Sequence, residues 1–352
     1  MASETDLLRR HILMTVSAGL SVAATGCHHF SSRRLQRPVD WHGQLRITNG
    51  RVSDQHGNPL SIAGPSLFWH NLGWAQPGGL EPGSYYKADV VAAVLRDWNA
   101  PIIRAAIGAE RPGGYIPEPD YAWQKLTAVA DAAIDNGMYV IVDWHTHHAE
   151  DYPEAAAQFF TRVARRYSGN PNIIYEIYNE PLPAADWTGV IRPFAEPLIK
   201  TIRAIDRDNL IVVGTPSWSQ DVDAAARAPL EVSDNLAYTL HFYAGTHRQG
   251  LRDKALFAMD RGLPLFVTEW GAINADGDGT ADIAETERWM AFLREHRLSH
   301  CNWSLHSKAE GASILKPGTP AHGRWTTADL TATGQLTTGI MREWHRRRYR
   351  SI

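Results

Sequence analysis

The chain alternates between short apolar runs and longer segments in which apolar residues recur every three or four positions. The apolar runs are continuous rather than interrupted by polar residues, which is typical of parallel strands covered on both faces. They predict eight strands, at residues 61–65, 101–106, 139–144, 173–178, 210–214, 237–241, 264–269 and 300–304.

Amphipathic segments lie between these runs and predict helices. The clearest are residues 87–98, residues 120–136 with Gly137 as a typical helix end, residues 153–167 and residues 281–297. Eight alternations of strand and helix predict an α/β fold, a single (β/α)8 TIM barrel. An open doubly wound sheet is the alternative, but no glycine-rich phosphate-binding motif follows an early strand. Residues 45–60 predict a small N-terminal β-hairpin at the barrel floor.

The first forty residues have the pattern of an export signal rather than of a folded segment. Arg9 and Arg10 precede an apolar stretch over 12–24, which at about 13 residues is shorter than the roughly 20 needed to span a bilayer. The paired arginines suggest the twin-arginine route. Cys27 ends a sequence that resembles a bacterial lipobox and is a candidate for lipidation, although Ala24 stands where leucine is usual. Cleavage nearby without a lipid is the alternative.

These patterns divide the chain into a signal peptide (1–27), a polar tether (28–42) and a barrel domain (43–349). We therefore expect an exported protein in the periplasm, at the cell surface or outside the cell. A lipid anchor to the membrane is one form of this expectation.

Composition adds three observations to this picture. The net charge of −3 provides no field that would attract nucleic acid. The chain has 13 Trp, and such a surplus indicates either exposed aromatic platforms or a large aromatic core. With only two cysteines there is no disulfide framework, and Cys301, inside an apolar run, is predicted to be a buried free thiol.

Polar side chains end several of the predicted strands. In a barrel of this type the carboxyl ends of the strands build the active site, so these residues are expected to lie together. Any one of them alone could be structural, but the whole set at one level indicates a site. The set is Arg104, His145, Asn179, Glu180, His241, Tyr243, Glu269 and Trp303.

Two carboxylates in this set suffice to cleave a glycosidic bond. In the retaining mechanism one carboxylate attacks the sugar, and the other protonates the leaving oxygen and then activates water. The two groups must lie about 5–5.5 Å apart, which strands four and seven of a barrel permit across its mouth. Asn179 is placed to bond the sugar 2-hydroxyl, while Tyr243 and Arg104 are placed to hold an anionic nucleophile.

Several segments resemble those of glycoside hydrolase family five. The two most specific are IYEIYNEP at 174–181 and LFVTEWG at 265–271. RAA at 104–106, DWH at 143–145, HFYAGTH at 241–247 and NWSL at 302–305 resemble the other site segments in the same order. The resemblance covers residues 43–349 and is strongest to the bacterial endoglucanases (cellulases).

The resemblance implies an enzyme, an endo-1,4-β-glucanase, with Glu180 as acid/base and Glu269 as nucleophile. It also implies a supporting and substrate-binding shell of Arg104, His145, Asn179, His241, Tyr243, Trp303, Lys308, Glu310 and Trp69. Many members have a histidine after the first strand, where this chain has Phe68. The implied partner is a β-1,4-glucan polysaccharide or oligosaccharide, bound by a monomer that needs no cofactor.

Metal binding is the competing interpretation of two segments. His145, His147 and His148 follow a strand and lack helical ligand spacing, so we interpret His147 and His148 as loop residues near the sugar. Residues 276–279 have a calcium-like composition without a complete binding loop, which favours a turn. We therefore expect no metal.

Three other functions remain open at the level of sequence. A related β-mannanase or a transglycosylase could use the same fold and the same pair of glutamates. A glucan-binding protein without catalysis is the third, although the presence of both Glu180 and Glu269 argues against it.

Overall fold

The computed structural model describes residues 36–71, 80–345 and 349, which all belong to one compact unit, Leu35–Ile352. The export signal expected at the N-terminus lies outside the described residues. Within the described part of the chain, no helix combines the length and apolar character needed to cross a membrane.

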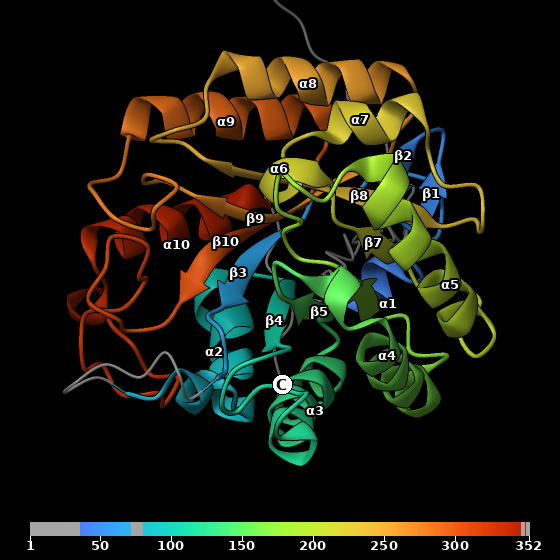
Figure 1. Cartoon of the computed structure of the whole chain (residues 1–352). Helices are drawn as coiled ribbons and strands as arrows, with labels where there is room; N and C mark the ends of the chain where they lie inside the picture. The colour runs from blue at the N-terminus through green and yellow to red at the C-terminus, as the bar shows by residue number, and fades with distance from the viewer. Residues whose placement is uncertain (1–35, 72–79, 346–348, 350–352) are drawn as a thin grey trace, which may run out of the picture. The chain divides into compact units, whose positions relative to one another are not determined.

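Eight parallel strands close into a barrel, which confirms the predicted fold (Figure 1). The strands follow one another around the barrel in chain order, and the last pairs with the first. They are β3 (Ala63–Leu67), β4 (Ile102–Gly108), β5 (Tyr139–His145), β6 (Ile173–Glu176), β7 (Ile211–Val213), β8 (Leu236–Tyr243), β9 (Leu265–Gly271) and β10 (His300–Leu305).

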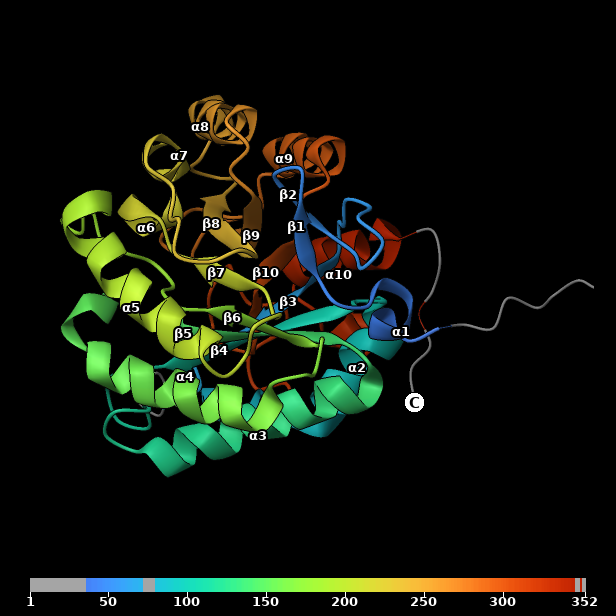
Figure 2. The same cartoon turned by 90° about the vertical axis from the view of Figure 1, so that its right-hand side faces the viewer.

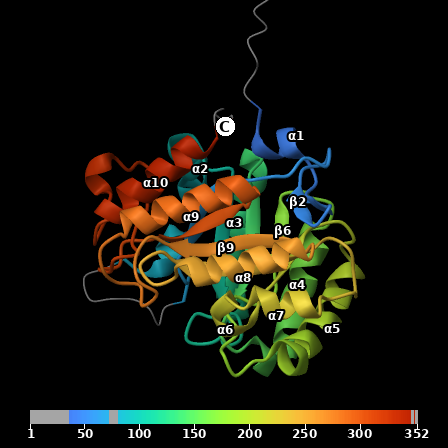
Figure 3. The same ribbon diagram turned by 90° about the horizontal axis from the view of Figure 1, so that it is seen from above.

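Helices surround the barrel on the outside, as Figure 2 shows. Their apolar faces pack on the outward side chains of the strands in one large core. Viewed from above in Figure 3, α8 and α9 run side by side next to β9. The main helices are α2 (Ala88–Trp98), α3 (Pro119–Asn136), α4 (Pro153–Tyr167), α5 (Arg192–Arg203), α7 (Val222–Arg227), α8 (Gln249–Asp260), α9 (Ile283–His296) and α10 (Ala332–Trp344), with shorter turns at α1 (Pro38–His42) and α6 (Pro216–Ser219).

A two-stranded hairpin precedes the barrel, as predicted. Its strands are β1 (Arg46–Thr48) and β2 (Arg51–Ser53), joined by Asn49 and Gly50, which both have positive φ. Two such residues in sequence suit the tight turn that matches the twist of a hairpin. Leu45 and Val52 pack in one cluster with inward side chains of the barrel strands, including the buried Cys301. The hairpin therefore closes the barrel floor and leaves the opposite end for the site.

The strand ends differ from expectation at two places that matter for the site. β6 ends at Glu176 rather than at residue 178, so Asn179 and Glu180 lie on the loop that follows it. Arg104 is the third residue of the seven in β4, not the end of a strand as expected. It is fully buried and reaches the site from below.

Candidate active site

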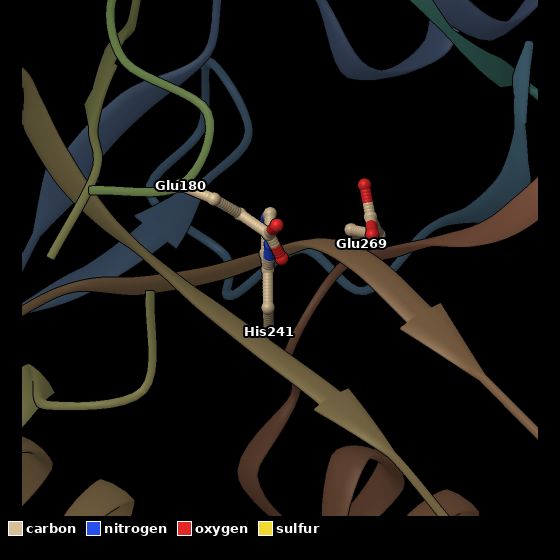
Figure 4. A group of neighbouring side chains, drawn as sticks. All are labelled: Glu180, His241 and Glu269. Atoms are coloured by element: carbon tan, nitrogen blue, oxygen red, sulfur yellow. The ribbon is translucent and has the colours of Figure 1, made fainter. Parts of the chain in front are cut away.

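Glu180 reaches toward His241 at the carboxyl end of the barrel, and Glu269 lies beside them (Figure 4). One carboxylate oxygen from each, together with a ring nitrogen of His241, lies in a group whose atoms are all within 4.8 Å of one another. Glu180 follows β6 and Glu269 lies in β9, so two strands of the barrel, β7 and β8, separate the elements that carry them. Their short separation suits a retaining pair, since an inverting pair is about 6.5–9.5 Å apart to admit a water.

Both oxygens of Glu269 receive hydrogen bonds. The hydroxyl of Tyr243 donates to Oε1 at 2.6 Å, and Nη1 of Arg104 donates to Oε2 at 2.9 Å. Hydrogen bonds to a carboxylate favour its ionised form and fix its orientation. These contacts equip Glu269 to act as a nucleophile.

Both oxygens of Glu180 contact imidazoles. Nδ1 of His241 lies 2.8 Å from Oε1, and Nε2 of His147 lies 3.1 Å from Oε2. His241 is buried, whereas the His147 side chain is 38% exposed. The two oxygens therefore differ: Oε1 is bound from the protein interior and Oε2 from the solvent side.

A buried ionic network lies beneath the pair. The Arg104 guanidinium bonds Glu176 at 2.7 Å, Asp143 at 2.9 Å and the side-chain oxygen of Asn179 at 2.6 Å, in addition to Glu269. Since that bond fixes the Asn179 amide, its Nδ2 points elsewhere, and it is buried without a hydrogen-bond partner among the described residues. This nitrogen is available to a sugar hydroxyl.

Sequence reasoning did not assign roles to Glu176 and Asp143, although both lie within the motifs it used. The available signal was a carboxylate inside an otherwise apolar strand, because an acid there must be paired. Asp143 contacts both Arg104 and Nδ1 of His145, the latter at 2.6 Å. Burial and the positive charge of Arg104 keep the pKa of His145 well below its ordinary value, so this imidazole is neutral.

Hydrogen bonding determines the protonation of His241. The hydroxyl of Thr268 donates its only hydrogen to Glu176 at 2.6 Å, so it must accept from Nε2 of His241, 2.9 Å away. Burial lowers the pKa of His241, but Glu176, Glu180 and Glu269 outweigh it and raise the pKa to about 9. His241 is therefore a doubly protonated donor at neutral pH.

The two glutamates have opposite electrostatic surroundings. Burial raises the pKa of Glu180, but the contacts from His147 and His241 outweigh it and bring the pKa to about 2. Burial and the charge of Glu180 raise the pKa of Glu269, against the attraction of His241 and Arg104. Without substrate, Glu180 is thus the more readily ionised of the two. An acid role for Glu180 needs a nearby source of its proton.

Aromatic rings border the pair on one side. Trp303 in β10 is 7% exposed and stacks on His145, with ring centroids 5.2 Å apart and planes 11° apart. Trp69 meets the same imidazole edge-on at 4.1 Å. The peptide bond between Trp303 and Ser304 is cis. Trp218, in α6, is 42% exposed, and Trp74 lies outside the described residues.

Phe68, which stands where a histidine was expected, packs against a different histidine. Its ring stacks on His306 with centroids 4.3 Å apart. His306 in turn contacts Glu310 at 2.9 Å, and Glu310 forms an ion pair with Lys308, whose ammonium lies 5.5 Å from the Phe68 ring. Lys308 and Glu310 therefore form one polar group on the same side of the barrel mouth as Trp303.

The cluster of Glu180, His241 and Glu269 resembles a metal site in composition. His241, however, uses both ring nitrogens, one on Glu180 and the other on Thr268. An imidazole with two donated hydrogens has no lone pair for a metal. The cluster suits two-carboxylate chemistry instead.

Comparisons with known proteins agree with this geometry. The model of the family "Cellulase (glycosyl hydrolase family 5)" matches residues 53–309, which include both glutamates. The chain belongs to glycosyl hydrolase family 5. It is a glycoside hydrolase of the endoglucanase type.

Individual relatives align with most of the chain. Endoglucanase Z of Dickeya dadantii is 49% identical over 97% of this chain and 74% of its own length. A solved structure from Cytophaga hutchinsonii has 43% identity and a TM-score of 0.83, covering 87% of this chain and 97% of that one. A variant of the catalytic domain of Thermobifida fusca endoglucanase Cel5A, in complex with cellotetraose, has 28% identity and a TM-score of 0.79, covering 87% and 100%.

Proposed function

We propose that this family 5 enzyme hydrolyses internal β-1,4-glucosidic bonds of a glucan and retains the configuration at the anomeric carbon. The observation that carries the proposal is the short separation of Glu180 and Glu269, with one oxygen of each within 4.8 Å of the other. A relative of the same fold is in complex with cellotetraose, which supports a β-1,4-glucan chain as the substrate.

In the first step Glu269 attacks the anomeric carbon and Glu180 protonates the departing oxygen. Arg104 and Tyr243 hold the attacking carboxylate by its two oxygens, so little reorganisation is needed. In the second step Glu180 removes a proton from water, which attacks the same carbon and releases Glu269. The proton that Glu180 gave away is thereby returned.

Sugar binding is assigned to the polar and aromatic groups around the pair. The buried Nδ2 of Asn179 is a donor for the 2-hydroxyl, a contact that strengthens in the transition state. The Trp303 ring provides an apolar face beside the cleavage point, and Trp69, Lys308 and Glu310 extend the binding surface. His145, held neutral by its surroundings, fixes the Trp303 ring from behind.

The test is a comparison of products on carboxymethylcellulose, mannan and xylan, with proton NMR of the first product from cellotetraose. We expect a rapid fall in viscosity on carboxymethylcellulose, little activity on the other two and β-configured initial product. Faster cleavage of mannan would favour the mannanase alternative, and longer oligosaccharides would favour a transglycosylase. The absence of any cleavage would leave only glucan binding.

We also propose that residues 1–27 direct export and that Cys27 carries a lipid. The support is the sequence pattern alone: Arg9 and Arg10, the short apolar stretch and the small residues before Cys27. Mass spectrometry of the protein made in a bacterial host is the measurement. An acylated Cys27 at the mature N-terminus is expected, and an unmodified N-terminus beyond residue 27 would contradict the lipid anchor.

A further inference from the structure

His147 differs from the other histidine on Glu180 in its position and its freedom. It lies on the loop after β5, where the hydroxyl of Tyr178 donates to its backbone oxygen at 3.0 Å. Its ring meets Trp69 edge-on at 6.0 Å, and its Nε2 reaches Oε2 of Glu180 at 3.1 Å. The imidazole is thus held against the outer oxygen of Glu180 while 38% of the side chain stays exposed.

His241 is unsuited to supply a proton to Glu180. Both of its nitrogens donate within the buried network, and three carboxylates around it raise its pKa to about 9. It keeps its charge throughout the neutral range. A proton that moves during catalysis must therefore come from the other side of Glu180.

The surroundings of His147 favour a proton that is bound but exchangeable. Burial lowers its pKa, while Glu180 by hydrogen bond and charge, and Glu269 and Glu110 by charge, outweigh this and raise it. Glu110 is held in place by the hydroxyl of Thr146 at 2.8 Å. His145, two residues away, is neutral, so among the described residues the charges around His147 are mainly negative.

We propose that His147 is a positioning residue that stores the proton of the catalytic acid. In the free enzyme the proton is on Nε2 of His147, and Glu180 is a carboxylate. When substrate binds, this proton moves along the 3.1 Å contact to Oε2 of Glu180, leaving a neutral imidazole and a carboxylic acid. The pair keeps one proton and zero net charge throughout. The inference rests on the proposed acid role of Glu180.

Sharing a proton between two groups extends the active pH range upward. The active form of the pair holds one proton, and this proton is lost only above the ordinary imidazole pKa, since the carboxylate helps to retain it. If His147 could not titrate, activity would be lost through the pKa of Glu180 alone. The ordinary pKa values of imidazole and glutamate differ by about two units, which sets the scale of the effect.

The experiment measures kcat/KM for cellotetraose between pH 4 and 10 in the wild type and in His147→Gln. Glutamine keeps an N–H donor for Glu180 but cannot store a proton. We expect the alkaline limb of the variant to move about two pH units lower, so that above both limbs its kcat/KM is about a hundredfold below that of the wild type. His148→Gln, at an exposed neighbouring position, is the matched control and should keep the wild-type limb.

An activated aryl cellobioside separates proton storage from a structural role. Its leaving group needs little protonation, so the limb of His147→Gln should return toward that of the wild type on this substrate. An unchanged limb on cellotetraose, or an equal loss of activity at every pH, would overturn the inference. So would a His147→Gln variant inactive on both substrates. If the wild type itself does not cleave cellotetraose, the proposed function fails instead.

Discussion

Arg104 brings a permanent positive charge into the barrel, and three carboxylates surround it. Glu176, Asp143 and Glu269 each lie within 2.9 Å of its guanidinium, and all are buried. Buried charges are costly to desolvate, and such a network persists only when every member is paired. Within this network Arg104 holds both Asn179 and the nucleophile Glu269 by hydrogen bonds. The positions of the reacting groups are therefore set by contacts one layer below them.

Trp303 provides the residue-scale prediction. Trp303→Ala should lower kcat/KM on cello-oligosaccharides more than tenfold, equivalent to about 1.4 kcal/mol of transition-state binding, because the sugar loses an aromatic face. The ring also stacks on His145, so the free energy of unfolding should fall by about 3 kcal/mol. Trp303→Phe, which keeps a flat ring, is the control, and its kcat/KM and its free energy of unfolding should both fall less. Normal kcat/KM in the folded fraction of Trp303→Ala would show that the ring is only part of the core.

Among the elements, several helices end on a residue with a left-handed backbone. Gly137 ends α3 with φ 66°, and Arg297 ends α9 with φ 57°. Only glycine adopts this conformation without a steric penalty from Cβ. Arg297 is exposed, so its strain is not offset by burial of the side chain.

The two helix ends give a paired prediction. Arg297→Gly should raise the free energy of unfolding by about 0.5–1 kcal/mol, and Gly137→Ala should lower it by about 1 kcal/mol. Arg297→Ala serves as the control, because it removes the charge and keeps Cβ, and should bring no gain. Urea unfolding at neutral pH measures all three. A gain in Arg297→Ala equal to that in Arg297→Gly would attribute the effect to charge rather than to backbone strain.

At this scale the sequence predicted the strands well, because a strand buried on both faces is a continuous apolar run. It gave no bounds for α5, α6, α7, α8 and α10. Of these, α5 contains Pro197, and in α6 Ser217 and Trp218 have positive φ. The site residues at strand ends were found by their contrast with apolar neighbours. Glu176 was given no role, because whether its side chain lies at the level of the site depends on where β6 ends. His147 was placed on a loop near the sugar, but its contact with Glu180 was not predicted, since no sequence pattern fixes which way a loop imidazole points.

At the scale of the whole molecule, the tryptophan surplus is chiefly a core feature. Seven tryptophans among the described residues are buried. Two of them, Trp270 and Trp289, stack on Phe242, and the ring centroids of Trp289 and Phe242 lie 3.9 Å apart. Buried neutral histidines are the second feature spread over the fold. Such groups bind protons more weakly in the folded protein than in the unfolded chain, so stability depends on pH.

The lowered pKa values of four histidines predict that the folded protein loses stability in acid. Burial lowers the pKa of His42, His70 and His345 to about 4 and that of His300 to about 3, below the ordinary 6.5. Below pH 6.5 the unfolded chain takes up these protons first, so the free energy of unfolding should fall steadily from pH 6.5 toward pH 4. His241 acts in the opposite sense: its pKa of about 9 means that its contribution is lost as pH rises through 9.

Urea unfolding at several pH values between 4 and 10 measures this profile, with a maximum expected near pH 6.5. His300→Gln removes one titrating group, while its side-chain oxygen can still accept the bond from Trp270. In this variant the slope of the free energy of unfolding against pH, between pH 6.5 and 4, should decrease by the equivalent of about one bound proton. An unchanged slope would show that His300 is not a neutral group in the folded protein.

The central claim, that Glu269 is the nucleophile and Glu180 the acid/base, is tested most directly by chemical rescue. In Glu269→Gly the space of the missing carboxylate admits azide, which should attack the anomeric carbon and restore turnover of an aryl cellobioside with an α-configured glycosyl azide as product. Glu180→Ala should instead form the covalent intermediate on Glu269 from the activated substrate without added azide. When azide is added, it should attack this intermediate and give a β-configured glycosyl azide. Rescue of Glu180→Ala with inverted product, and none of Glu269→Gly, would contradict the assignment.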